Sequence, residues 1–273
     1  TWIRPGRAAL SGRQPLAVAV QGVEVFTREQ GRGEPVLFLH GNPDSADIWE
    51  PLIGRLADRY RCITMDLPGF GRSMAPEDFD CSFANLGRFL DGVVGALGID
   101  RPLDLVTHDF GGAYGMAWSA MSPHKVRRQV VMNHPFFVGD YRWHAWARIW
   151  RTPVLGELST LFMGWWPLYW ASVRAGSRQL STARIRQSHG HLNPAMKRMI
   201  LRLYRAADPE ALKEWEPRML AAARQIPTLV LWGEHDPYIP AWVAGIEADA
   251  GLSCGLWRCG IVVPFGTAGE RDA

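Results

Sequence analysis

Runs of apolar residues recur along the chain and predict the strands of a sheet. Four segments are almost continuously apolar, which is typical of strands buried on both faces: 35–41, 60–71, 103–109 and 126–135. Residues 23–31 alternate apolar with polar side chains and predict one more strand. Residues 1–20 have no clear pattern and are expected to form a poorly specified arm.

Segments with helical spacing separate these strands. They cover 45–58, 83–99 and 112–123. Strands that alternate with helices predict an α/β fold, in which a mostly parallel sheet is flanked by helices.

The strand pattern stops after the fourth apolar run. Residues 136–224 are helical in spacing and hold seven of the thirteen tryptophans, and the α/β pattern resumes at 226–236. We therefore expect three segments: 1–135 as the first part of the α/β core, 136–224 as an inserted helical cap, and 225–273 as the second part of the core.

Charge changes this picture only locally. The net charge is +3, which gives no indication of nucleic acid as a partner. Residues 141–224, however, hold 14 Lys+Arg against 5 acidic residues. A set of solvated, arginine-rich helices explains this surplus. The sharper alternative is a positive lid that attracts anionic substrates or stabilises a departing anion.

The four cysteines are scattered and form no CxxC pair, which suggests reduced thiols in a cytoplasmic protein and neither a disulfide framework nor a zinc site. No apolar stretch is long enough to span a bilayer, and no signal-peptide pattern is present, so we expect no membrane partner. The chain begins at Thr1 without Met, which is compatible with a processed or incomplete N-terminus.

The stretch "LVTHDFGGAYG" (105–115) carries the most specific chemistry. A buried strand runs into a turn with Asp109 at its tip, followed by Gly111 and Gly112. Small residues let a tight strand-to-helix turn expose one side chain, as in the G-x-S-x-G nucleophile elbow. Here Asp replaces Ser, and Thr107 replaces the usual first glycine. An Asp that only caps the following helix is the structural alternative.

Three further motifs accompany this elbow: "HGNP" (40–43), "DLPGFGRS" (66–73) and "LVLWGEHDPYIP" (229–240). Their order and spacing resemble the α/β-hydrolase superfamily, in the branch of haloalkane dehalogenases and epoxide hydrolases. The resemblance covers roughly residues 23–240 and implies a small apolar organic substrate, with no metal and no organic cofactor.

The resemblance assigns roles to individual residues. Asp109 matches the nucleophile that forms an ester intermediate. The backbone N–H groups of Phe110 and Asn42 match the oxyanion hole. Asp236 matches the acid that orients a catalytic histidine, which would activate water.

Two activities within this branch stay open, and the dehalogenase is slightly favoured. In such dehalogenases an Asn like Asn42 and a Trp after the nucleophile bind the departing halide. Phe110 stands in place of that Trp, although Trp143 or Trp146 of the cap could substitute. These two residues belong to the stripe "WHAWARIW" (143–150), which we expect to serve packing first and the pocket wall second.

The alternative activity is epoxide hydrolysis, in which cap tyrosines protonate the oxygen of the substrate. Candidates from the resemblance are Tyr141, Tyr169 and Tyr204. After the fourth apolar run come Asn133 and His134. An Asn cannot serve as the acid, and we expect the histidine to have a structural role.

The tail departs from the family pattern. Family members carry their catalytic histidine well beyond the acid, but this chain has no histidine after His235, which is a poor substitute because it adjoins Asp236. Residues 244–273 have no clear amphipathic helix, so we expect the last strand and helix to be lost. We hypothesise a shift of reading frame near 244–255. The resulting alternative is an inactive or single-turnover hydrolase, or a product that does not fold stably.

Overall fold

The fold is built around one sheet of eight strands. The computed structural model describes residues 16–134, 143–164, 166–167, 182–249 and 251–257. The strands lie in the order β1-β2-β4-β3-β5-β6-β7-β8. Their bounds are Leu16–Val20, Val23–Gln30, Glu34–Leu39, Tyr60–Met65, Leu103–His108, Val126–Met132, Thr228–Gly233 and Ser253–Trp257, from β1 to β8. The expected α/β fold with a mostly parallel sheet is confirmed.

The parallel strands are those with continuous apolar sequences. β3 lies between β4 and β5 and is parallel to both. Leu37, Phe38 and Leu39 are fully buried there, because helices cover both faces of the sheet. The carboxyl ends of these strands therefore meet at one edge, which is where side chains for chemistry gather in such sheets.

The prediction of a featureless N-terminal arm is wrong for its last five residues. β1 pairs with β2 in an antiparallel hairpin. Only Val18 of β1 is buried, while Leu16 is 53% exposed. An edge strand that buries one residue in five leaves little apolar pattern in the sequence, so the pattern could not reveal it.

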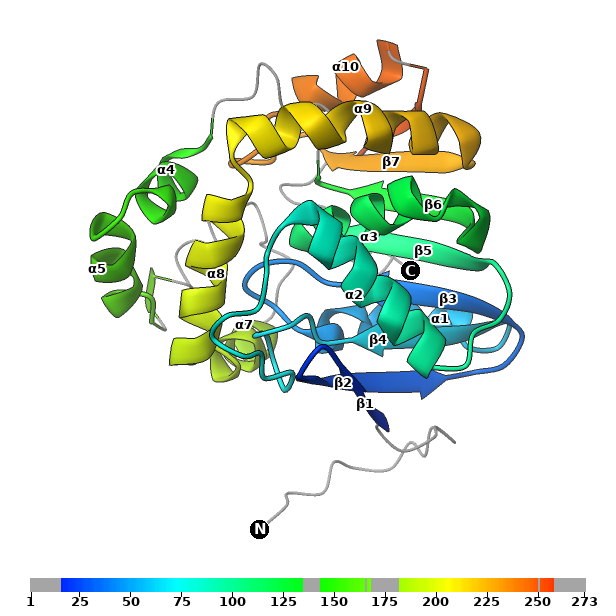
Figure 1. Cartoon of the computed structure of the whole chain (residues 1–273), viewed down its shortest axis with the longest axis horizontal. Helices are drawn as coiled ribbons and strands as arrows, with labels where there is room; N and C mark the ends of the chain where they lie inside the picture. The colour runs from blue at the N-terminus through cyan, green and yellow to red at the C-terminus, as the bar shows by residue number, and fades with distance from the viewer. Residues whose placement is uncertain (1–15, 135–142, 165, 168–181, 250, 258–273) are drawn as a thin grey trace, which may run out of the picture.

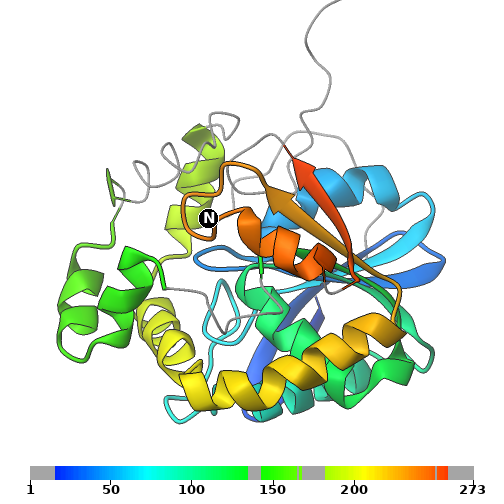
Figure 2. The same cartoon turned by 90° about the horizontal axis from the view of Figure 1, so that it is seen from above.

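Helices cover the two faces unequally. α2, α3 and α9 lie together on one face, and α1 lies on the other (Figures 1 and 2). The larger core contains Phe89 of α2 and Trp118 of α3, and the smaller one contains Trp49 beside Phe38. The bounds are η1 Ala46–Trp49, α1 Glu50–Leu56, α2 Phe83–Ala96, α3 Phe110–Met121, η2 Pro123–Lys125 and α9 Pro209–Gln225.

The helices α4, α5, α7 and α8 come between β6 and α9 and lie beyond one end of the sheet, on the left of Figure 1, and we refer to them as the cap helices. They are α4 Ala145–Arg151, α5 Leu155–Leu161, α7 Thr182–Gly190 and α8 Pro194–Ala206. α8 approaches the carboxyl end of β5, where Tyr204 packs against Phe110. The division of the chain at residues 136 and 224 remains a prediction.

The expectation that the last strand and helix are lost is wrong as far as Trp257. α10 spans Trp242–Asp249, and β8 follows it in parallel with β7. Val243 and Ala244 of α10 are buried in the larger core. The helix has eight residues and a short apolar face, which is too weak a pattern to recognise in the sequence.

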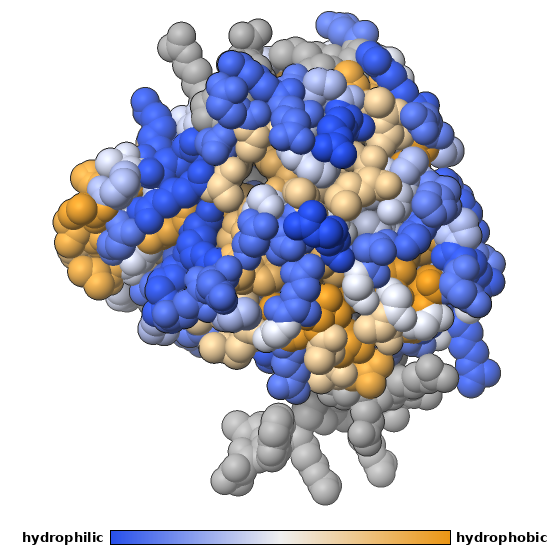
Figure 3. Space-filling view, viewed as in Figure 1, coloured by the Kyte–Doolittle hydropathy of each residue, from blue (hydrophilic) through white to orange (hydrophobic). Residues whose placement is uncertain are grey.

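The outer face of α5 is apolar and exposed. Leu158, Leu161 and Phe162 are each at least half exposed, at 52%, 74% and 76%. An apolar patch is visible at the left of Figure 3, where α5 lies in the same view of Figure 1. Within the part of the chain that the structure describes, no helix combines the length and apolarity needed to cross a bilayer.

Candidate active site

Asp109 occupies a strained turn between β5 and α3. Its backbone has φ 48° and ψ −126°, a conformation that residues other than glycine rarely adopt. The backbone around this turn is packed so closely that Gly41 and Gly111 have no space for a side chain. A Cβ on Gly41 would lie 2.4 Å from the Cβ of Asp109, and one on Gly111 would lie 2.5 Å from the carbonyl oxygen of Leu39. This is the geometry expected of a nucleophile elbow.

The Asp109 carboxylate is held by backbone donors. Its Oδ1 accepts the N–H of Asn42 at 2.7 Å. Burial raises the pKa of Asp109 to about 6, against the lowering effect of the N–H groups of Asn42 and Phe110, and the charge of Asp236 adds to the rise. Since α3 begins at Phe110 and no side-chain cap bond comes from Asp109, the helix-cap alternative is weaker than the elbow.

Asp236 follows β7 and lies in the same region. Its Oδ1 accepts the N–H groups of Tyr238 and Ile239 at 2.8 and 3.0 Å, and its Oδ2 accepts Nδ2 of Asn133 at 2.5 Å. Burial raises the pKa of this carboxyl. Among the described residues, no histidine donates to Asp236, and the side chain of His235 is exposed.

Three histidines surround the elbow, and burial lowers the pKa of each, to about 4 for His108 and His134. His40 donates Nδ1–H to the carbonyl of Gly41 and accepts the N–H of Leu67 at Nε2. His134 is hydrogen-bonded to the backbone of Asp109 and lies against Gly112. These contacts support the structural role expected for His134.

The cap helices bring aromatic side chains to the elbow. The rings of Tyr204 and Phe110 lie 4.7 Å apart, and Trp143 lies 5.8 Å from Tyr204. Trp146 instead stacks on Trp150 and is 46% exposed, which places it away from a buried pocket wall. The other two candidates, Tyr141 and Tyr169, fall outside the described residues.

His144 is a residue of this region that the sequence did not indicate. Its ring lies between Tyr204 of α8 and Tyr238 of the Asp236 loop, at 6.0 and 5.2 Å. Nδ1 accepts the N–H of Ala147 at the start of α4, so the proton of the neutral ring is on Nε2. Nε2 lies 3.4 Å from Oη of Tyr204. The only signal was a polar residue inside an aromatic stripe.

Burial lowers the pKa of His144 to about 4, so its imidazole is neutral at pH 7. With Nδ1 occupied as an acceptor, the ring donates from Nε2 to the Tyr204 hydroxyl and cannot accept a proton there. The arrangement can therefore supply hydrogen-bond donors above the elbow. No group of three or more His, Cys, Asp or Glu residues that could hold a metal occurs within the described ranges.

Comparison with known proteins agrees with the fold. A family model described as the alpha/beta hydrolase fold matches residues 34–256. A haloalkane dehalogenase of Agrobacterium fabrum is 36% identical over 123 residues, which cover 45% of this chain and 40% of that protein. The match thus spans less than half the length of this relative.

Solved structures of other proteins superpose on most of this chain. That of haloalkane dehalogenase DbeA from Bradyrhizobium elkani has a TM-score of 0.73 at 27% identity and covers 89% of this chain and 88% of its own. A laboratory-evolved variant of the potato epoxide hydrolase StEH1 has a TM-score of 0.74 at 18% identity, with 90% and 93% covered. At that identity the second likeness concerns the fold alone.

Proposed function

Since this chain belongs to the alpha/beta hydrolase fold family, we propose that it is a hydrolase with Asp109 as its nucleophile, acting on a carbon–halogen bond of a small apolar organic substrate. The observation that carries the proposal is the strained backbone of Asp109, whose carboxylate oxygen Oδ1 accepts a hydrogen bond from the N–H of Asn42. Dehalogenases among the relatives support this choice of leaving group.

In the first step, Oδ2 of the Asp109 carboxylate attacks the carbon that bears the halogen. The C–O bond forms as the carbon–halogen bond breaks, and the halide leaves with the electron pair. Oδ1 stays on the N–H of Asn42 and becomes the carbonyl oxygen of the ester. The carboxylate thus enters the reaction already oriented.

In the second step, water attacks the ester carbonyl. Negative charge develops on Oδ1, where the N–H groups of Asn42 and Phe110 stabilise it. The tetrahedral intermediate collapses to the alcohol and the Asp109 carboxylate, and a proton is released. A base must take that proton. Without one, the reaction stops at the ester after a single turnover.

An apolar substrate is supported by the aromatic rings that meet beside the nucleophile, those of Phe110, Trp143 and Tyr204.

We propose epoxide hydrolysis as the second candidate. The observation that favours it is the Tyr204 hydroxyl beside Nε2 of His144, since an opening epoxide needs a proton donor at its oxygen. The side chain of Phe110 has no N–H to bind a halide, which favours the same alternative.

The first test is intact-protein mass spectrometry with bromoalkanes and epoxides in water enriched in ¹⁸O. Turnover through an ester places the label in Asp109, because water attacks the carbonyl carbon. Bromide or diol release is measured in parallel. A stable adduct at Asp109, formed with at most one equivalent of bromide and with no release of alcohol or diol, would support the single-turnover alternative. Product release with no label in Asp109 would overturn the proposed nucleophile.

A matched control for this test is Asp91→Asn. Asp91 is a carboxylate on α2 that pairs with Lys125 at 2.6 Å and accepts Nε1 of Trp118 at 2.9 Å. This variant should keep the labelling and the product release, whereas Asp109→Asn should lose both.

A further inference from the structure

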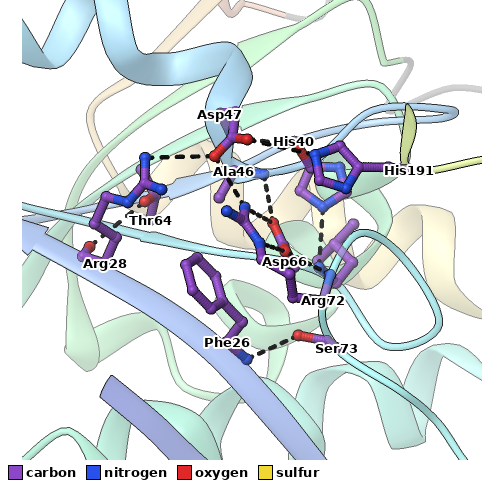
Figure 4. Close-up of polar contacts among 12 residues, drawn as sticks. Phe26, Arg28, His40, Ala46, Asp47, Thr64, Asp66, Arg72, Ser73 and His191 are labelled. Carbon is purple, nitrogen blue, oxygen red and sulfur yellow. Dashed lines mark hydrogen bonds and ion pairs between the residues drawn. The ribbon is translucent and has the colours of Figure 1, made fainter. Parts of the chain in front are cut away.

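A polar cluster joins the cap helices to the core away from Asp109. Its centre is Asp47 in η1, with a side chain that is 9% exposed. Oδ1 of Asp47 accepts Nη2 of Arg72 at 2.9 Å and lies 3.4 Å from Nη1 of Arg28. Oδ2 accepts Nε2 of Gln187 at 3.0 Å. The same oxygen faces Nε2 of His191 at 3.4 Å (Figure 4).

The core side of the cluster is held rigidly. Asp66 is fully buried and accepts the N–H groups of Ala46 and Arg72 at 2.7 and 2.8 Å. It also accepts Nε of Arg72 at 2.7 Å, which fixes the guanidinium toward Asp47. The same guanidinium lies 3.6 Å from the centre of the Phe26 ring. Asp47 is therefore a fixed anion at the edge of the core.

The cap side consists of two residues at the end of α7. Gln187 is in the helix, and His191 follows its last residue, two positions before the Asn193 cap of α8. The His191 side chain is 21% exposed, so protons from solvent can reach it. The segment leads directly into α8, the helix that carries Tyr204.

We propose that Asp47 and His191 form a proton-dependent clasp, which holds α7 and the start of α8 against the core when His191 is charged and loosens when it is neutral. The carboxylates whose charge acts on His191 are Asp47 and Asp66, and the cation that acts on it is Arg72. The clasp is independent of the proposed function, because it needs no substrate.

The charges around His191 determine whether the clasp is stronger at low or at high pH. Its hydrogen bond to Asp47 raises the pKa above the ordinary value of 6.5, against the effects of burial and of Arg72, while Asp66 raises it further. Arg28 lies beside Asp47 and acts on the clasp through it, and α7 itself carries Arg186 and His189. The charged clasp is thus complete below pH 6.5 and is lost as pH rises through the raised pKa. The Gln187 bond does not titrate and remains.

Hydrogen exchange of the α7 amides tests this proposal in the full chain without any ligand. We expect their protection factors to fall about fivefold between about pH 5.5 and pH 9, the size of effect that a partly exposed ion pair supplies. His191→Lys, which stays charged, should keep high protection throughout. His191→Gln, which stays neutral, should give low protection throughout.

His189→Gln is the control, since it removes a histidine from the same helix and leaves the Asp47 contact in place. It should follow the pH dependence of the wild type. The proposal is overturned if wild-type protection is independent of pH, or if His191→Gln retains the wild-type dependence. His191→Lys and His191→Gln keep a polar side chain at a partly exposed position, so we expect both variants to fold. Unchanged protection of the β3 and β5 amides checks that they do.

Discussion

Asp109 is the residue at which local stability and chemistry conflict most clearly. Its backbone is in a strained region and its carboxylate has a raised pKa, and both features cost folding free energy. The surrounding packing compensates, because Gly41 and Gly111 allow the backbone to come close. Strain that the neighbouring structure holds in place is typical of functional sites.

Replacing Asp109 with Asn should therefore stabilise the protein at neutral pH. The folded carboxyl has a pKa of about 6 against an ordinary 3.8, so the folded state binds more protons between these values and stability falls as pH rises. We expect no gain for Asp109→Asn near pH 4 and a gain of about 1–3 kcal/mol at pH 7. Urea unfolding at the two pH values measures it. An equal gain at both pH values would mean that the buried charge of Asp109 is not what destabilises the wild type.

Tyr204→Phe tests the donor above the elbow. If the hydroxyl stabilises the departing group, the loss should depend on that group. We expect kcat to fall about 100-fold for epoxides, where an alkoxide develops, and less for bromoalkanes, where the halide is a weaker acceptor. His144→Gln should cost less than Tyr204→Phe, because its amide can still donate to the hydroxyl. Equal losses on both substrates would argue against this role.

The site was predictable where a residue lies at the end of an apolar strand. Asp109 and Asp236 follow β5 and β7, and Asn42 follows β3, so motif and topology pointed to the same edge. Their roles remain proposals. His144 was not predictable, since its place depends on how α4 docks against α8. Long-range docking of helices leaves no local pattern in the sequence.

At the scale of elements, burial decided which strands the sequence revealed. β3, β4 and β5 are buried on both faces and appear as continuous apolar runs. β1 and β8 are the two edges of the sheet and were missed. In β8, Leu256 is 61% exposed, so the strand has no continuous apolar pattern to recognise. Pairing with the neighbouring strand defines it instead.

The packing of α3 against β3 should make Gly111 intolerant of a side chain. A Cβ there would lie 2.5 Å from the Leu39 carbonyl oxygen, which is backbone and cannot move cheaply. We expect Gly111→Ala to destabilise the protein by about 2–3 kcal/mol in urea unfolding. Gly95 in α2 has open space around it, so Gly95→Ala should instead stabilise by about 0.4–1 kcal/mol. Similar effects of both would contradict the steric explanation.

At the scale of the whole molecule, arginines of the cap helices connect elements. Arg151 donates to the carbonyls of Tyr204 and Ala207, and Arg202 donates to those of Pro76 and Phe79. Arg205 pairs with Glu157 at 2.7 Å. These contacts favour a structural explanation of the positive surplus over a lid that attracts anions, because the guanidinium groups are used to join the helices.

The carboxylate of Asp104, near the start of β5, should contribute to acid unfolding. Asp104 accepts from Arg127 and Arg128 at 2.8 and 2.7 Å, and these hydrogen bonds lower its pKa against the effect of burial. A lowered pKa gives stability that is present above the ordinary value of 3.8 and is lost as pH falls through the folded pKa. Removing the charge should therefore matter at neutral pH and not in acid.

We expect Asp104→Asn to lower the free energy of unfolding by about 1–3 kcal/mol at pH 7, because two neighbouring guanidinium groups lose their shared anion. Both arginines are partly exposed, which keeps the loss below that of a fully buried pair. Thermal unfolding followed from pH 7 to about pH 2.5 should show the variant and the wild type converging. Asp58→Asn, at an exposed position, should match the wild type throughout. A difference that persists in acid would mean that packing, and not charge, makes Asp104 stabilising.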